Sequence, residues 1–199
     1  MARNDSRERI LRAAMDAIAE RGLAHLRMED VGNRVGMSPG HILYYYRSKQ
    51  ALLLETLRWS DDLLHERGAE ELPYLPTAEE RLRWFIDIYL PTGPGQPEWL
   101  LWLQVWALGG EDPDVAAVTD RLNARWEAEL AGLIRFGVGR GEFQASAAPS
   151  FAGEYLAILD GLSLHVLHDT PALDRERAVA IAWRIAAHEL GFRGRPPLA

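Results

Sequence analysis

Apolar residues recur along this chain every three or four positions, the spacing of one face of an α-helix. The first stripe runs through residues 5–21, with Ile10, Ala14 and Ile18 on one face. The same pattern predicts further helices over residues 28–35, 39–46, 48–67, 77–90, 98–108, 112–139, 148–168 and 174–192. No alternating strand pattern and no internal repeat stands out. The pattern therefore predicts an all-α protein of about nine helices.

The residues around the second and third predicted helices indicate how these helices are joined. Gly36 suits a tight turn, because glycine enters left-handed backbone space without strain. Ser38 is a good N-cap and Pro39 a good first helical residue, since the N–H that proline lacks would be unpaired there. Ser48 can cap the next helix, with Lys49 in its first turn. Two short helices across a glycine turn make a helix-turn-helix, whose second helix enters the DNA major groove.

At these positions the sequence resembles the TetR family of transcriptional regulators. That family combines an apolar helix, a Gly-[Val/Met]-Ser turn, a Leu-Tyr-x-[Tyr/His]-Phe helix and a Ser-Lys start to the next helix. The residues that fit are Met28, Val31, Val35, Gly36, Met37, Ser38, Gly40, Tyr45, Ser48, Lys49 and Leu52. The resemblance implies a DNA-binding head on a larger helical body.

Four residues depart from the family pattern. Arg27 stands where a threonine cap is usual, and Gly32 where alanine is usual. We expect both changes to weaken the first helix of the motif slightly, since glycine costs about 1 kcal/mol relative to alanine in a helix. Leu43 replaces a tyrosine and so removes one hydroxyl able to contact a phosphate, and Tyr46 replaces a phenylalanine.

The motif supplies candidate contacts to phosphates and to base edges. Lys49 lies at a helix start, where its ammonium adds to free backbone N–H groups and the helix dipole to hold a phosphate. Gly40 permits close approach to DNA, Tyr44 can pack on a thymine methyl, and His41 either meets a base edge or is plain surface. Arg34 either adds charge to the interface or stays solvated. The predicted DNA-binding residues are Arg34, Ser38, Pro39, Gly40, His41, Tyr44, Tyr45 and Lys49.

The distribution of charge supports this division of the chain. The formal net charge of the 199 residues is −7, but residues 1–50 carry +3 and the remainder −10. A basic head on an acidic body is typical of a DNA-reading domain joined to a domain that does not bind DNA. We therefore predict a helix-turn-helix domain over residues 1–50 and a helical ligand-binding and dimerisation domain over residues 51–199. One helix crosses the border.

No apolar run approaches the length of a membrane span, and the charged N-terminus is unlike a signal peptide. The chain has no cysteine, which excludes disulfides and thiolate chemistry. We expect a cytoplasmic protein.

Aromatic residues are concentrated in the middle helices. Trp99, Trp102 and Trp106 share one helical face, and either form a packed core or line a ligand cavity. Tryptophans in an acidic body favour a cationic ligand through cation–π contact. The candidate ligand-binding residues are Tyr89, Trp99, Trp102, Gln104, Trp106, Trp126 and Glu154.

The last two predicted helices, residues 148–168 and 174–192, are candidates for a four-helix dimer interface. They also resemble the family, in which Asp-Gly-Leu sits within the long penultimate helix, here residues 160–162. The C-terminal part is more loosely similar to the subgroup that includes choline-responsive repressors. The candidate interface residues are Gly153, Ala157, Gly161, His165 and Trp183.

Motifs of other function classes are weak or absent. His165 and His168 share a helical face but lack the further ligands of a zinc site, so we predict no metal and no cofactor. The segment GLSLH lacks the second glycine of a nucleophile elbow, and no phosphate loop or dinucleotide fingerprint occurs, so we predict no enzymatic activity. The sequence favours a dimeric repressor that binds a palindromic operator and is released by a small-molecule effector. The alternatives are a DNA-binding dimer without a ligand, and an all-α enzyme or adaptor.

Overall fold

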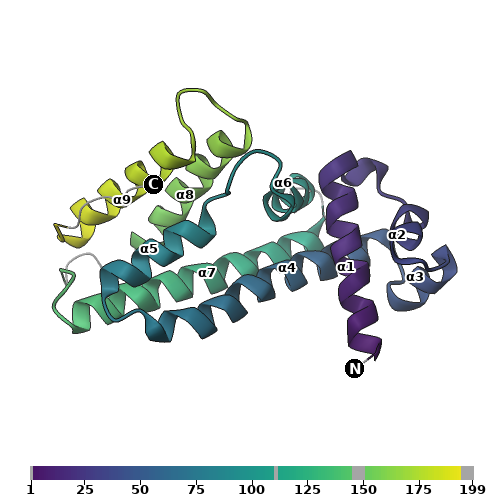
Figure 1. Cartoon of the computed structure of the whole chain (residues 1–199), viewed down its shortest axis with the longest axis horizontal. Coiled ribbons are helices and arrows are strands. Elements are labelled where there is room, and N and C mark those ends of the chain that lie inside the picture. Colours follow the sequence, from purple (N-terminus) through teal and green to yellow (C-terminus); the bar gives the residue numbers. More distant parts are fainter. Residues whose placement is uncertain (1, 110–111, 145–150, 194–199) are drawn as a thin grey trace. The chain divides into compact units, whose positions relative to one another are not determined.

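The computed structural model describes residues 2–109, 112–144 and 151–193, and the regular structure in these residues is helical throughout (Figure 1). The α-helices are α1 Ala2–Arg21, α2 Met28–Val35, α3 Pro39–Tyr45, α4 Lys49–Glu71, α5 Ala78–Tyr89, α6 Pro97–Gly109, α7 Pro113–Gly139, α8 Phe151–Leu167 and α9 Arg175–Leu190. Short 3₁₀ turns occur at η1 Leu23–His25 and η2 Leu72–Tyr74. The predicted all-α class is confirmed. The predicted start of the penultimate helix at residue 148 lies outside the described residues.

The chain divides into two compact units. The first comprises residues 1–64 and 95–122, and the second comprises residues 65–94 and 123–199. The predicted domains, 1–50 and 51–199, instead divided the chain at a single position. Two helices, α4 and α7, each contribute to both units.

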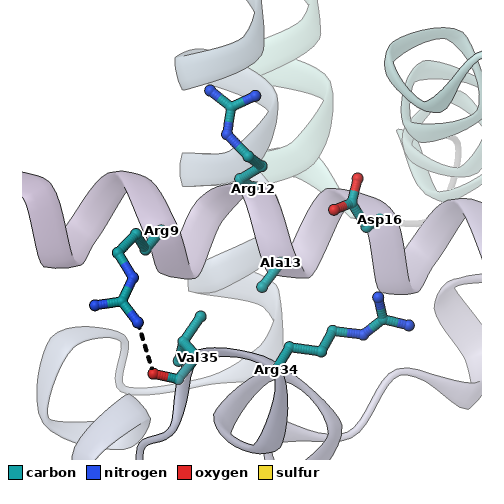
Figure 2. Close-up of a pocket in the computed structure, with 6 residues that line it drawn as sticks. All are labelled: Arg9, Arg12, Ala13, Asp16, Arg34 and Val35. Carbon is teal, nitrogen blue, oxygen red and sulfur yellow. Dashed lines mark hydrogen bonds between the residues drawn. The ribbon is translucent and has the colours of Figure 1, made fainter.

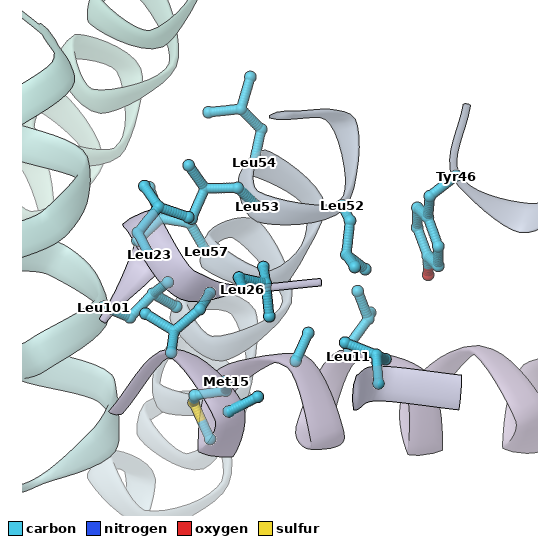
Figure 3. Close-up of a cluster of buried hydrophobic side chains, with 14 of the residues drawn as sticks. Leu11, Met15, Leu23, Leu26, Tyr46, Leu52, Leu53, Leu54, Leu57 and Leu101 are labelled. Carbon is cyan, nitrogen blue, oxygen red and sulfur yellow. The ribbon is translucent and has the colours of Figure 1, made fainter. Parts of the chain in front are cut away.

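The first unit joins the helix-turn-helix to α6 and the start of α7 through one apolar core (Figure 3). Ile10 and Ile18 of α1 are almost fully buried, as are Leu101 and Val105 of α6. Burying a side chain of this size contributes roughly 1.5–3 kcal/mol. The helix-turn-helix is therefore stabilised by helices that lie far beyond it in the sequence.

The turn between α2 and α3 has the expected caps and one unexpected contact. Gly36 has a φ of 72°, and the Ser38 Oγ accepts a hydrogen bond of 3.2 Å from the His41 N–H. Arg27 makes no side-chain cap to α2, as expected. At Gly32, however, an added Cβ would lie 2.5 Å from the Met37 carbonyl oxygen. The expectation that alanine would suit position 32 better is wrong for this backbone, because the turn approaches α2 too closely for a side chain.

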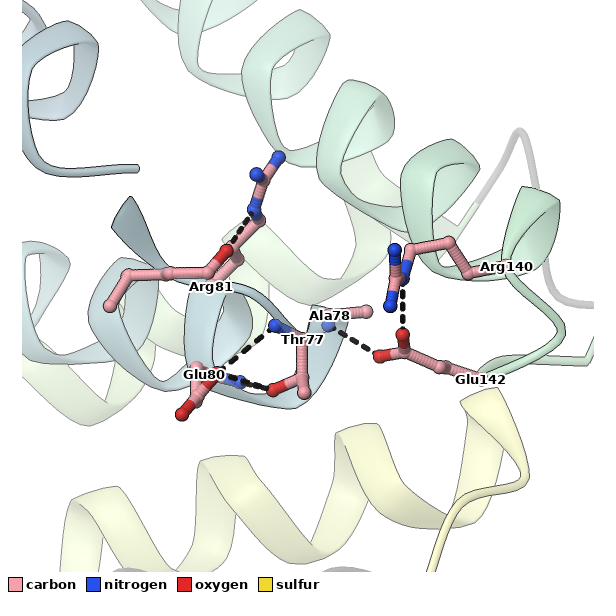
Figure 4. Close-up of polar contacts among 7 residues, drawn as sticks. Thr77, Ala78, Glu80, Arg81, Arg140 and Glu142 are labelled. Carbon is pink, nitrogen blue, oxygen red and sulfur yellow. Dashed lines mark hydrogen bonds and ion pairs between the residues drawn. The ribbon is translucent and has the colours of Figure 1, made fainter. Parts of the chain in front are cut away.

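In the second unit, α5 begins at a capping box formed by Thr77 and Glu80 (Figure 4). The Thr77 N–H donates to Glu80 Oε2 at 3.0 Å, and the Glu80 N–H donates to the Thr77 Oγ1 at 3.2 Å. Glu142 also accepts from the Ala78 N–H at 2.5 Å, and this bond ties the start of α5 to the turn after α7. Two of the N–H groups left free at a helix start are thereby paired with side chains.

Helices α8 and α9 pack side by side in this unit (Figure 1). The Tyr155 hydroxyl of α8 is buried and donates to the Ala182 carbonyl of α9 at 2.7 Å. Among the helices of the described residues, none is long and apolar enough to cross a membrane.

Candidate functional site

Helix α3 is anchored by one buried side and presents the other to solvent. Ile42 is fully buried, and so is most of Tyr46, directly after the helix. The exposed residues of α3 are Pro39, Gly40, His41, Leu43 and Tyr44. This arrangement matches a recognition helix, which packs by one face and reads DNA with the other.

Three aromatic rings gather on the exposed part of α3. The His41 ring stacks on Tyr45 with centroids 5.6 Å apart, and Tyr44 meets Tyr45 edge-on at 5.8 Å. Tyr44 is 74% exposed, so its ring and hydroxyl are available to a partner. His41 is held in place by Tyr45, because these residues lie one helical turn apart.

Lys49 is the first residue of α4, as predicted from the motif. The Ser48 Oγ accepts a 3.0 Å hydrogen bond from the Ala51 N–H and so caps this helix. The Lys49 Nζ donates to the Ala24 carbonyl at 3.3 Å. The lysine therefore links α4 to η1 while its ammonium keeps further N–H groups for a phosphate.

Lys49 also borders a groove of about 620 Å³ in the first unit. Gln104 and Asp112 also line this groove. Gln104, a candidate ligand residue, accepts a 3.2 Å hydrogen bond from the Leu23 N–H. Asp112 accepts one of 2.6 Å from the Gln50 side chain. The hydrogen bond from the Leu23 N–H to Gln104 therefore holds η1 against α6.

Arg34 lies in a shallow depression between α1 and α2 (Figure 2). Its guanidinium forms an ion pair with Glu20, and this contact lowers the pKa of the Glu20 carboxyl. In the same depression Arg9 donates to the Val35 carbonyl at 2.9 Å. Arg34 is thus already paired within the bundle, whereas the other candidate DNA contacts lie on α3, at its N-cap Ser38, or at the start of α4.

The candidate ligand residues fall into two groups, one in each unit. In the first unit, Trp106 lies 6.1 Å from Trp99 and 5.7 Å from Trp102, measured between ring centroids. The second group contains Tyr89 and Trp126. Glu154 is exposed on α8.

Trp126 is the centre of an aromatic cluster in the second unit that the sequence only partly indicated. Its ring centroid lies 4.4 Å from His65, 5.3 Å from Tyr89 and 5.7 Å from Phe85. The nearness of His65 and Phe85 to these rings was not predicted, because both come from helices whose packing the chain order does not indicate.

Two carboxylates adjoin this cluster. The Tyr89 hydroxyl donates to Asp160 Oδ1 at 2.7 Å, and His65 Nδ1 lies 2.5 Å from Glu129 Oε2. Burial raises the pKa of the Asp160 carboxyl, and the hydrogen bond from Tyr89 partly opposes this rise. Aromatic faces beside a buried carboxylate can hold an organic cation. We call Phe85, Tyr89, Trp126 and Asp160 the acid–aromatic cluster.

The candidate dimer residues also separate into two sets. Ala157, Gly161 and His165 are exposed along one side of α8, together with Leu164. Gly153 instead faces Glu127 of α7, and Trp183 is buried with its ring edge-on to Phe192. Only the first set forms an uncovered surface, which we call the α8 stripe.

The histidine pair carries no sign of a metal site in the described part of the chain. His165 Nδ1 lies 3.4 Å from the Thr170 Oγ1, and no group of three or more metal-ligating side chains occurs among the described residues.

Comparison with known families accounts for both parts of this architecture. Residues 10–56 match the model of the tetR family of bacterial regulatory proteins. Residues 78–191 match the model of the C-terminal region of BetI-type transcriptional repressors.

Individual relatives agree with these matches. The HTH-type transcriptional regulator BetI of Escherichia coli (strain K12) is 28% identical over 176 residues, which cover 86% of this chain and 87% of the relative. A transcriptional regulator of Saccharomonospora viridis, solved in complex with choline, is 31% identical with a TM-score of 0.85, covering 93% of this chain and 97% of that one. A TetR-family regulator from Rhodococcus sp. is 26% identical with a TM-score of 0.80, covering 92% and 97%. The chain therefore belongs to the TetR family of bacterial transcriptional regulators, with a C-terminal region of the BetI type.

Proposed function

We propose that this regulator is a homodimeric repressor that binds a palindromic operator and is released by a small quaternary ammonium cation. The observation that carries the DNA-binding half is the exposed face of α3, with Lys49 at the start of the following helix. These elements supply base-reading and phosphate-holding groups from adjacent positions.

The surface that α8 leaves uncovered supports dimerisation. The α8 stripe combines two small residues, Ala157 and Gly161, with the partly exposed Leu164. An added Cβ at Gly161 would meet no atom within 4 Å, so another helix can approach closely there. Two copies related by a two-fold axis would place their α3 helices in successive major grooves, about 34–36 Å apart or a multiple of that.

The acid–aromatic cluster supports a cationic effector. A trimethylammonium group is attracted to the faces of Trp and Tyr, at about 0.5–2 kcal/mol per contact, and Asp160 supplies the opposite charge. The Saccharomonospora viridis regulator was solved in complex with choline. A cation that separated Tyr89 from Trp126 would contact both rings.

Two helices connect the cluster to the DNA-binding unit along the chain. Helix α4 carries Leu57 in the core of the first unit and, two turns later, His65 against Trp126. Helix α7 carries Leu122 in that core and Trp126 one turn later. A ligand that moves Trp126 would therefore act on both helices. A rotation of each bundle would change the separation of the two α3 helices and lower operator affinity.

The test uses the full-length protein and an operator selected from random duplex DNA. We expect a palindromic site that is released by choline chloride. The neutral isostere 3,3-dimethylbutan-1-ol, which has the same shape without the charge, should release much less. If the protein selects no DNA sequence from the random duplexes, the repressor proposal is overturned. Equal release by choline and its isostere, or by neither, would overturn the cationic effector.

A DNA-binding dimer without an effector is the second candidate. This candidate is favoured by the close packing of the Phe85, Tyr89 and Trp126 rings, because a hydrophobic core without a ligand packs in the same way. In that case choline would leave both operator affinity and tryptophan fluorescence unchanged.

A further inference from the structure

The exposed surface of α3 has two chemically different flanks. Successive residues of an α-helix are about 100° apart, so Pro39 and Leu43 share one flank, while His41 and Tyr45 share the other. Gly40 and Tyr44 lie between them. The His41–Tyr45 flank carries an imidazole and a hydroxyl, whereas the Pro39–Leu43 flank carries no side-chain donor or acceptor.

Leu43 is conspicuous on this apolar flank because its side chain is 45% exposed. It is one of a few large apolar side chains that the described residues leave this accessible, and its neighbour Tyr44 is another. A single exposed leucine on an ordinary surface needs no explanation. This one lies on the seven-residue helix α3, which we propose reads DNA, about one turn from Gly40.

The neighbouring Gly40 leaves room for DNA to come close. A Cβ added there would meet only the Ser38 Oγ, at 4.0 Å. Leucine is shorter than the tyrosine usual at its position, so it reaches a base edge only where the helix backbone approaches the groove. Pro39 and Gly40 add little bulk on that side.

The chemistry of leucine restricts what it can recognise. It has no hydrogen-bonding atom, so it contributes nothing to a phosphate or to the donor and acceptor pattern of a base edge. The C5-methyl group of thymine is the apolar feature that the major groove displays. We infer that Leu43 is a specificity-determining residue that reads a thymine methyl in each half of the operator. This inference rests on the proposed DNA binding through α3.

The experiment measures how much each thymine methyl group contributes to operator binding. An operator is first selected with the full-length wild-type protein. Each thymine is then replaced by deoxyuridine, which removes one methyl and leaves the base-pairing and groove hydrogen-bonding groups unchanged. Binding constants are measured for the wild type and for Leu43→Ala, Leu43→Met and Tyr44→Ala, with circular dichroism to confirm that each variant is folded.

At one symmetric pair of thymines, deoxyuridine should weaken wild-type binding about fourfold per methyl, because the burial of one methyl group is lost. Leu43→Ala should bind the thymine and deoxyuridine versions equally. Leu43→Met, which keeps an apolar side chain of similar size, should retain the discrimination, and so should Tyr44→Ala at that position.

The inference is overturned if no deoxyuridine substitution separates wild type from Leu43→Ala. It is also overturned if Tyr44→Ala, and not Leu43→Ala, abolishes the discrimination. Failure of the wild type to select any operator is a different result, because it rejects the proposed DNA-binding function itself.

Discussion

At the scale of single residues, Lys49 donates to the Ala24 carbonyl and, in our proposal, also holds a DNA phosphate. Lys49→Ala should weaken binding to all duplexes about equally and reduce the slope of log K against log salt by about 0.9, the value for one phosphate. Gel shifts at several salt concentrations measure this slope. Arg83→Ala, which removes one positive charge from the exposed face of α5, is the matched control and should leave the slope unchanged. A changed sequence preference at an unchanged slope would contradict the phosphate role.

A second test at this scale asks whether a side chain at position 32 raises or lowers the stability of the folded protein. Gly32→Ala gains up to about 1 kcal/mol of helix propensity but forces a Cβ against the Met37 carbonyl. Overpacking of this kind costs about 1–3 kcal/mol, so we expect a lower free energy of unfolding in urea. Gly40→Ala, whose added Cβ would meet only the Ser38 Oγ at 4.0 Å, should be neutral or stabilising. Stabilisation by both substitutions would show that the turn relaxes freely.

Protonation of the Asp160 carboxyl should make effector binding depend on pH. Burial raises the pKa of its carboxyl, so acidification removes the negative charge at a higher pH than for an exposed aspartate. Choline affinity, measured by calorimetry, should fall as the pH is lowered through this range. Asp160→Asn should bind choline more weakly at neutral pH and without this pH dependence. Asp87→Asn, which removes another carboxylate of the same unit, should keep the wild-type profile.

The same raised pKa has the opposite consequence for stability. The folded protein binds this proton more readily than the unfolded chain, so stability falls as pH rises through the interval above the ordinary aspartate pKa. Asp160→Asn should therefore melt at a higher temperature than the wild type at neutral pH, even though it binds choline less tightly. A lower melting temperature would mean that the ionised carboxylate stabilises the fold.

At the scale of elements, the α8 stripe should hold two copies together. Gly161→Arg places a long charged side chain on the stripe and should yield monomers in sedimentation with loss of operator binding. Gly139→Arg is matched, because Gly139 is also exposed with no atom near its missing Cβ, but it lies at the end of α7. Retention of the dimer in Gly161→Arg, or its equal loss in both variants, would place the interface elsewhere.

At the scale of the whole molecule, the binding of the effector and the binding of the operator must be coupled reciprocally. If choline lowers operator affinity by some factor, bound operator must lower choline affinity by the same factor, typically about 5–150-fold. Choline titrations monitored by tryptophan fluorescence, with and without saturating operator, measure this factor. Equal affinities in the two titrations would make choline a bound ligand without a role in release.

Local patterns in the sequence were sufficient to predict the helices and the helix-turn-helix. The left-handed Gly36, the Ser38 cap and the Thr77–Glu80 box each depend on residues within one turn of each other. Helical periodicity is likewise read over a few turns, which is why the all-α class and the helix-turn-helix followed from the chain alone.

Tertiary packing decided which distant residues meet. It joined α6 to the core of the DNA-binding unit, paired Arg34 with Glu20 and buried Trp183, which the sequence had suggested for the dimer interface. It also brought His65, Phe85 and Asp160 to Tyr89 and Trp126, from four helices spread along the chain. A helix's apolar stripe shows that it packs but not against which partner, because many partners bury the same area equally well.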